Sequence, residues 1–291
     1  MRVQLIINPK AGRGRAMAAA LDAEMEFHEV GWRTDLRVTS GPGEATDIAR
    51  DAASRFDLIV ACGGDGTLCE VLNGLTGSDT PVAFIPAGTG NDFARTVGLP
   101  AAPGEAAREV VRGQSRRLDL MRLDNPPMIA VNIIGIGFDA AVAARMNQRT
   151  RLCGGAVPYL AAVLMELARM QPVRLRLRVD EDTWEGKALL VAIANARSYG
   201  GGMCIAPDAR PDDGQLDVVL VEPIGRVEFL RTLPRVFRGT HVAHPAVSCR
   251  RGREVVVESD VPAPVMVDGD LRTTTPLRVT VQPGAAHLWL P

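Results

Sequence analysis

A glycine-rich turn with an aspartate at its centre is the strongest chemical feature of this 291-residue sequence. The run 63–67 reads Gly-Gly-Asp-Gly-Thr and lies between an apolar stretch at 58–61 and a helical pattern. Glycines let the backbone approach an anion closely, and the start of a helix presents free N–H groups and a positive dipole end. The run therefore predicts a phosphate site, with a tight turn capped by Asp65 as the simpler alternative.

A second turn of the same design follows the next apolar stretch. The run 86–94 reads Pro-Ala-Gly-Thr-Gly-Asn-Asp-Phe-Ala and comes directly after the stretch at 82–85. Ligands of parallel α/β sheets bind beyond the carboxyl ends of the strands, so both turns are expected to converge on one crevice. Asp65 and Asp92 would repel bare phosphate, but carboxylates suit Mg²⁺ that is held between them and phosphate oxygens.

A third turn follows the first apolar stretch and adds positive charge. The run 8–15 reads Asn-Pro-Lys-Ala-Gly-Arg-Gly-Arg, and its cations Lys10, Arg13 and Arg15 suit the neutralisation of phosphate. A short basic loop that is merely solvated surface is the open alternative. The sequence contains neither the Walker pattern nor a complete Gly-x-Gly-x-x-Gly, which disfavours a Walker ATPase and an ordinary Rossmann dehydrogenase.

Alternating strand and helix patterns between Met1 and about Leu120 predict the parallel α/β layer that positions these turns. The expected strands are 3–7, 35–39, 58–62 and 82–85, and the expected helices are 16–30, 44–54, 68–75 and 105–112. After Leu120 the pattern is mainly β, with strands expected at 173–179, 189–194, 216–221, 254–259, 265–267 and 277–281. Helices are expected there at 140–146, 159–170 and 227–237.

Chain length and the change of pattern predict two domains, 1–120 and 121–291. A single hydrophobic core rarely grows beyond about 250 to 300 residues. The last apolar segment, 286–290, is strand-like, and a chain end of this type often pairs with an existing sheet edge. Whether it returns to the first domain is left open by the pattern.

Composition and charge exclude several classes of protein. The net charge of −1 shows no chain-wide basic excess, so no nucleic-acid partner is expected. The five cysteines lie far apart without metal-binding spacing and are expected to be reduced thiols. No run approaches the roughly 18 to 20 apolar residues of a spanning helix, and no signal-peptide pattern opens the chain. The expected compartment is the cytoplasm.

The ordered set of motifs resembles the diacylglycerol kinase catalytic domain in its soluble bacterial lipid kinase form. The matching runs are 8–12, 63–67 with Glu70 and the Asn-Gly pair at 73–74, and 88–94. Further matches at 117–120, 135–140, 207–214 and 267–270 follow in order, so the resemblance spans nearly the whole chain. The Gly-Gly-Asp-Gly turn also occurs in NAD kinases and phosphofructokinase-like folds, so specificity lies in the ordered set.

The resemblance implies an N-terminal nucleotide-binding α/β domain of the NAD kinase and phosphofructokinase-like type, a C-terminal β-sandwich domain that binds the acceptor, and an active cleft between them. It also implies an ATP- and Mg²⁺-dependent lipid kinase of phospholipid biosynthesis, with diacylglycerol converted to phosphatidic acid as the first hypothesis. Other lipids (phosphatidylglycerol, ceramide or a long-chain base) and a soluble acceptor such as NAD are alternatives. A nucleotide-binding regulator without catalysis is a third reading.

Residue roles follow from the same resemblance. ATP is expected to contact Asn8, Pro9, Lys10, Gly12, Arg13, Thr39, Gly64, Asp65, Gly66, Thr67, Leu68, Glu70, Gly88, Thr89 and Asn91. Asp65, Asp92 and Asp119 are expected to organise Mg²⁺ and water at the phosphates.

The acceptor hydroxyl needs a base, because its proton must leave as the new bond forms. Asp270 stands where the family usually shows glutamate, and Asp268 is the alternative base. Turn chemistry alone makes the Asp-Gly pair at 268–269 a hairpin turn.

A second, structural Mg²⁺ is implied near 210–215, bound by the carboxylate of Asp213 and the backbone carbonyls of Arg210 and Gln215. A plain turn explains this segment equally well.

Contact with lipid is expected to be peripheral, at the inner face of the membrane. The apolar positions at 159–165 and the cations Arg145, Arg149 and Arg151 are candidates for that contact. Core packing and ordinary surface charge explain the same residues more simply. A homodimer is left open.

Overall fold

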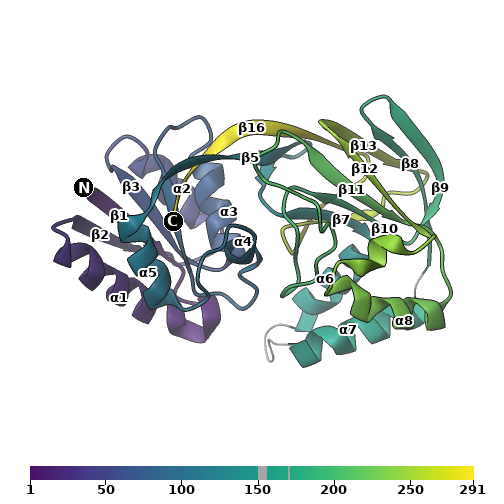
Figure 1. Cartoon of the computed structure of the whole chain (residues 1–291), viewed down its shortest axis with the longest axis horizontal. Coiled ribbons are helices and arrows are strands. Elements are labelled where there is room, and N and C mark those ends of the chain that lie inside the picture. Colours follow the sequence, from purple (N-terminus) through teal and green to yellow (C-terminus); the bar gives the residue numbers. More distant parts are fainter. Residues whose placement is uncertain (150–155, 170) are drawn as a thin grey trace. The chain divides into compact units, whose positions relative to one another are not determined.

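The computed structural model describes residues 1–149, 156–169 and 171–291. The chain divides into two compact units. Unit 1 consists of Met1–Leu120 with Pro283–Pro291, and unit 2 consists of Met121–Gln282. Each unit has hydrophobic clusters of its own, and Figure 1 labels the helices and strands that form them.

Unit 1 contains a parallel sheet in the order β2-β1-β3-β4. The strands are β1 (Arg2–Ile7), β2 (Arg33–Val38), β3 (Leu58–Gly63) and β4 (Val82–Pro86). Strands β3 and β4 are buried at every position, as expected for parallel strands that helices cover on both faces. The four predicted strands are confirmed, with ends that differ by one or two residues.

Helices cover both faces of this sheet (Figure 1). They are α1 (Arg15–Glu29), α2 (Glu44–Ala52), α3 (Asp65–Gly74), α4 (Asp92–Thr96) and α5 (Pro103–Arg112), with a 3₁₀ turn η1 (Ala11–Gly14) before α1. Alanines of α1 and the aromatic ring of Phe27 pack with α5 on one face. Helices α2 and α3 pack on each other and against β1, β3 and β4. The sequence did not predict α4.

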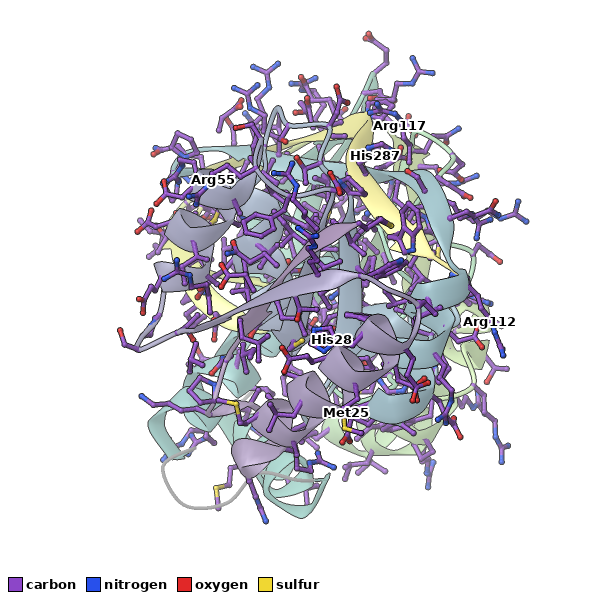
Figure 2. All side chains as sticks on the ribbon, turned by 90° about the vertical axis from the view of Figure 1, so that its left-hand side faces the viewer. Met25, His28, Arg55, Arg112, Arg117 and His287 are labelled. Atoms are coloured by element: carbon purple, nitrogen blue, oxygen red, sulfur yellow. The ribbon has the colours of Figure 1, made fainter. Side chains whose placement is uncertain are left out.

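The chain end completes unit 1. Strand β16 (Leu277–Leu290) pairs with unit 2 strands in its first half, and its last residues place Leu288 opposite Val82 of β4 in parallel. Trp289 packs on the α1 and α5 cluster, and its Nε1–H donates to Val110 O at 2.8 Å. Figure 2 shows Arg117 and His287 on the same side of the unit, where both contact Asp79. The predicted strand at 286–290 is confirmed.

Unit 2 is a sandwich of antiparallel sheets. One sheet has the order β12-β11-β10-β7-β14-β15, and the other contains β16, β13, β8 and β9 together with the pair β5 and β6. The strands are β5 (Gln114–Asp124), β6 (Pro127–Ala130), β7 (Ile133–Gly137), β8 (Val173–Val179), β9 (Asp182–Ala188), β10 (Leu190–Ala194), β11 (Leu216–Val221), β12 (Val247–Gly252), β13 (Glu254–Ser259), β14 (Pro264–Val267) and β15 (Asp270–Thr274). Alternate residues of β8 and β13 enter the core shared with the first sheet.

Helices lie on the outer face of the six-stranded sheet (Figure 1). They are α6 (Phe138–Arg149), α7 (Ala156–Arg169) and α8 (Arg226–Val236), followed by the 3₁₀ turn η2 (Thr240–Ala243). Val163 of α7 and Phe229 of α8 join Leu190 and Val219 of the sheet in one apolar cluster. The three predicted helices are confirmed, although position 170 lies outside the described residues. Within the described part of the chain, no helix is both long enough and apolar enough to cross a membrane.

Candidate active site

Three glycine-bearing turns contact one another at the carboxyl edge of the unit 1 sheet. A Cβ atom added at Gly88 would lie 2.5 Å from Gly64 Cα, and one added at Gly12 would overlap Ala87 O. Gly12 also has a left-handed φ of 57°, which disfavours other residues. The turns after β1, β3 and β4 therefore approach one another backbone to backbone at these glycines.

Hydrogen bonds fix the first and third turns. Asn8 donates through Nδ2 to Thr67 Oγ1 at 3.2 Å and accepts the N–H of Lys10 at 3.1 Å. Arg15 donates through Nε to Gly12 O at 3.0 Å and through Nη2 to Gly88 O at 3.4 Å. Arg15 is therefore held at these turns, where a guanidinium group suits an anion.

Asn91 closes the third turn. It has a left-handed φ of 51°, and its Oδ1 accepts the N–H of Gly88 at 3.0 Å. Thr89, between the two glycines of this turn, is exposed. The first turn likewise exposes Lys10 and Arg13 and half-buries Pro9.

The turns after β2 and within α3 hold further predicted nucleotide contacts. Thr39 is buried and donates its N–H to Ile7 O at 2.9 Å. Glu70 Oε1 accepts the N–H of Gly43 at 3.0 Å, which fixes the start of α2. Gly66 is exposed at the start of α3, whereas Leu68 is fully buried and its N–H donates to Gly64 O at 3.2 Å. The structure thus gives Leu68 a packing contact in the core.

The carboxylates of Asp65 and Asp92 converge beside Gly90. A Cβ atom added at Gly90 would lie 3.3 Å from Asp65 Oδ2 and 3.1 Å from Asp92 Oδ2. Asp65 accepts the backbone N–H groups of Asp92 at 3.1 Å and Phe93 at 2.9 Å, so it caps α4. Asp92 Oδ1 pairs with Arg95 Nη1 at 2.7 Å. Asp65, which follows β3, thus caps the helix α4 that follows β4.

These two carboxylates fit the Mg²⁺ of a magnesium–nucleotide complex. Each carboxylate has about four lone-pair positions, so the bonds above leave acceptor capacity on both residues. In the described ranges no three histidine, cysteine or acidic side chains cluster closely enough to form a metal cage. A site with two carboxylates is what Mg²⁺ uses when water and phosphate supply its other ligands.

Asp119 lies on β5 within unit 1 and is buried. Its Oδ1 accepts the N–H of Gly284 at 2.8 Å, so it also joins β5 to the returning end of β16. Its predicted part in organising Mg²⁺ and water stays a prediction.

The two base candidates differ in their contacts. Asp268 and Gly269 both have left-handed φ values, 47° and 95°, as in a two-residue hairpin turn between β14 and β15. The carboxylate of Asp268 accepts three backbone N–H groups at 2.8 to 3.1 Å, from Val131, Asn132 and Ile133. Taking up a proton would weaken these bonds, which disfavours Asp268 as a base. Asp270 is half-exposed and pairs with Arg272 at 2.8 Å.

The residues at the expected second metal site form a cluster of ion pairs. Asp213 accepts a hydrogen bond from Arg251 Nη2 and one from the N–H of Gln215, the latter at 3.1 Å. Arg251 Nε also lies 3.3 Å from Asp217 Oδ1. One guanidinium group faces two carboxylates here, so negative charge remains at the cluster, and the binding of Mg²⁺ by Asp213 stays a prediction. Arg210 is exposed in the same turn.

An apolar pocket in unit 2 contains a buried acid that the sequence singled out only as part of a motif. The pocket lies between the six-stranded sheet and α8 and includes Phe138, Val163, Phe229, Asp139 and Tyr199. Burial raises the pKa of Asp139 to about 7, and the hydrogen bond from Tyr199 opposes this rise in part. Asp139 Oδ2 is buried and has no hydrogen-bond partner in the described part of the chain. Such an atom is available to a polar group of a bound molecule.

Comparison with known proteins agrees with this fold. Residues 2–123 match the diacylglycerol kinase catalytic domain, and residues 132–290 match the YegS C-terminal NAD kinase beta sandwich-like domain. The chain therefore belongs to the diacylglycerol kinase family, as the sequence motifs indicated. It is an enzyme of the lipid kinase class.

Individual relatives cover the whole chain. The diacylglycerol kinase of Mycobacterium tuberculosis is 36% identical over 299 residues, with 100% of this chain and 95% of the relative aligned. That of Bacillus subtilis is 30% identical over 273 residues, with 92% and 89% aligned. A putative diacylglycerol kinase from Bacillus anthracis has a TM-score of 0.85 at 25% identity, covering 100% of this chain and 95% of its own. The predicted α/β domain with a β-sandwich domain is thus confirmed.

Gly88→Ala tests the packing of the turns. The added methyl group would lie 2.5 Å from Gly64 Cα and 2.8 Å from Asn91 Oδ1, so we expect a loss of about 1 to 3 kcal/mol in the free energy of unfolding. Urea denaturation measures this loss. Gly104→Ala in α5 is the control, because its added Cβ has no neighbour within 4 Å. Equal stability of the two variants would contradict the close approach.

Arg251→Met tests the charge balance at Asp213 and Asp217. We expect a loss of about 1 to 2 kcal/mol at neutral pH, less than for a fully buried pair because Arg251 is partly exposed. Burial raises the pKa of Asp217, so acidification neutralises it early and the deficit should shrink as pH falls. Denaturation at two pH values measures this, with Arg250→Met as control. A deficit independent of pH would sink the assignment.

Asp139→Asn tests the buried acid. Between the unfolded pKa of 3.8 and the folded pKa of about 7, the folded protein holds a proton that the unfolded chain releases. This contribution to stability is complete below the lower value and is lost as pH rises through the upper one. We expect the variant to flatten the pH dependence by roughly 2 to 4 kcal/mol, measured by urea denaturation from acid to neutral pH. Exposed Asp182→Asn should leave the wild-type curve unchanged.

Proposed function

We propose that this enzyme transfers the γ-phosphate of ATP, bound with Mg²⁺ at the turns of unit 1, to a hydroxyl group of diacylglycerol. The observation that carries the proposal is the convergence of Asp65 and Asp92 beside Gly90, where three glycine-bearing turns contact one another. Two carboxylates that meet at one position are a poor site for an apolar ligand and a good one for a magnesium–phosphate group.

The nucleotide phosphates are proposed to lie against the turns of 8–14, 64–67 and 88–91. Glycines allow close approach there, and the start of α3 offers backbone N–H groups to phosphate oxygens. Lys10, Arg13 and Arg15 neutralise phosphate charge from the first turn. Bound Mg²⁺ would neutralise charge that develops between the β- and γ-phosphates, and Asp65 and Asp92 are the residues that would hold it.

Asp270 is proposed to accept the proton of the acceptor hydroxyl. Asp268 is occupied by three backbone N–H groups, so its role is to hold the hairpin that presents Asp270. Asp270 has one methylene fewer than the glutamate usual in the family, but its carboxylate has the charge that a base requires.

The unit 2 pocket is proposed to receive the apolar part of the acceptor. Its lining is mainly aliphatic and aromatic, with few polar groups, which is the composition of sites for apolar ligands. At one side of the pocket lie Tyr199 and Asp139, of which Asp139 is protonated below about pH 7. Both side chains suit hydrogen bonds to an ester or hydroxyl group. A lipid acceptor also implies that the enzyme works at the surface of a membrane, on the cytoplasmic side where ATP is available.

An acceptor panel tests the function. The purified protein, labelled ATP and Mg²⁺ are incubated with mixed micelles of diacylglycerol, phosphatidylglycerol, ceramide or a long-chain base, and with NAD in a separate arm. Labelled phosphatidic acid is the expected product. Label on another lipid would make that lipid the substrate, and label on NAD would make the protein a kinase of a soluble acceptor. Label on none of them would overturn the proposed kinase activity.

Asp270→Asn tests the base. We expect kcat to fall by about 10²- to 10⁴-fold while the KM for ATP stays near the wild-type value, because only proton transfer is affected. Asp270→Glu is the matched control and should retain activity, since it keeps the carboxylate. If Asp268→Asn instead removed activity without loss of stability, and Asp270→Asn did not, the two roles would be reversed.

A further inference from the structure

Helix α8 exposes an apolar stripe on its outer surface. Val227, Leu230, Pro234 and Phe237 follow one another at spacings of three, four and three residues, which places them on one face of the helix. The exposed fractions are 63% for Val227, 42% for Leu230 and 54% for Phe237. Single exposed apolar residues are ordinary, but a continuous stripe on one helix indicates an interaction surface.

A basic stripe runs beside the apolar one. Arg231 and Arg235 each follow an apolar member by one residue, so they lie about 100° further round the helix. Arg238 follows Phe237 in the turn after α8. A fourth arginine, Arg226, begins the helix, and all four are exposed. Within the described ranges none of these guanidinium groups pairs with an acidic side chain, while the one acid of the helix, Glu228, contacts His244 Nε2 at 3.2 Å.

The third face of α8 points inward. Phe229, Leu233 and Val236 join the cluster on the six-stranded sheet and line the apolar pocket that contains Asp139. The rings of Phe138 and Phe229 lie 4.8 Å apart between centroids. None of the α8 residues is fully buried, so the helix is held by partly covered side chains. Figure 1 shows α8 at the outside of unit 2, near α7.

Charge decides which partner suits this surface. A second copy of the chain would place one basic stripe against another across a two-fold interface, and like charges in contact oppose association. Anionic lipid headgroups attract arginines, and the acyl boundary accepts Val227, Leu230 and Phe237. Arginine side chains at the edge of an apolar stripe can keep their charge in the headgroup region while the stripe enters the bilayer.

We propose that α8 docks this enzyme on anionic bilayers, with the stripe of Val227, Leu230, Pro234 and Phe237 in the interface and the stripe of Arg231, Arg235 and Arg238 on the headgroups. This proposal rests on the proposed lipid kinase function, because a lipid acceptor gives the protein a reason to bind a membrane. Docking in this way brings the helix that covers the pocket to a surface that contains the acceptor. The sequence predicted a contact elsewhere, at 159–165 and at Arg145, Arg149 and Arg151. Leu164 and Met165 are exposed there, whereas Arg145 is mostly buried and paired with Glu166. Arg151 and the side chain of Arg149 lie outside what the structure describes.

Vesicle sedimentation tests the docking without catalysis. The full chain is mixed with vesicles of phosphatidylcholine alone and of phosphatidylcholine with phosphatidylglycerol, and bound protein is measured. We expect tight binding only to the anionic vesicles. Leu230→Ser with Phe237→Ser, and separately Arg231→Gln with Arg235→Gln, should each reduce the binding constant at least tenfold, and added salt should weaken binding of the wild type.

Matched controls come from unit 1. Leu21→Ser with Met25→Ser removes two exposed apolar residues four positions apart on α1, with exposed fractions of 48% and 65%. Arg55→Gln with Arg112→Gln removes two exposed charges, and Figure 2 shows Met25, Arg55 and Arg112 on the outer surface of unit 1. Both controls should bind vesicles like the wild type. Circular dichroism and thermal unfolding should be unchanged in all four variants, since the substituted side chains are exposed.

A kinase assay separates this proposal from the proposed function. The α8 variants should phosphorylate a water-soluble short-chain diacylglycerol at the wild-type rate and lose at least tenfold with diacylglycerol in anionic vesicles. If vesicle binding needs α8 but no diacylglycerol is phosphorylated, the docking proposal stands and the proposed function is overturned. If diacylglycerol is phosphorylated but neither α8 variant changes vesicle binding, the proposed function stands and the docking proposal is overturned. Self-association that the variants abolish would identify a second copy as the occupant and overturn the proposal.

Discussion

Contact between backbones at three turns is the constraint on which unit 1 depends. Gly12, Gly64 and Gly88 lie where a side chain would collide with, or crowd, a neighbouring turn, so peptide groups form the surface at the carboxyl edge of the sheet. Glycine costs conformational entropy on folding, and close packing of the turns offsets that cost. The result is a set of closely packed turns beside the start of α3 and the cations of the first turn.

Asp65 links this packing to chemistry. Its oxygens accept the N–H groups of Asp92 and Phe93, so a residue of the second turn fixes the start of the helix that follows the third. The same bonds hold its carboxylate beside Gly90, where the carboxylate of Asp92 arrives from α4. Stability and the orientation of two charged groups therefore depend on the same atoms. A site that is oriented before the ligand binds loses less free energy when it does.

Sequence predicted those parts of the structure that local patterns determine. Strands β1, β3 and β4 and the turns after them were predicted because buried strands are continuous apolar runs and glycines mark the turns. Helix α4 has five residues, too few for a periodic pattern, and its cap comes from Asp65, 27 positions away. The three N–H contacts of Asp268 and the pairing of Arg251 with Asp213 join residues 38 to 137 positions apart. Strand β9 was missed because it is mostly exposed and polar.

Unit 2 meets a different demand. Helix α8 is apolar on its inner face and again on part of its outer face. Its charged residues are three arginines and one glutamate. Packing on the sheet can satisfy only the inner face, and none of its side chains is fully buried there. The outer stripe therefore leaves apolar surface exposed to water, which is unfavourable, and such surfaces are typical of sites that bind a partner. The turns of unit 1 are fixed by contacts between backbones, whereas α8 of unit 2 is held by partly covered side chains, so the two units differ in how their candidate sites are built.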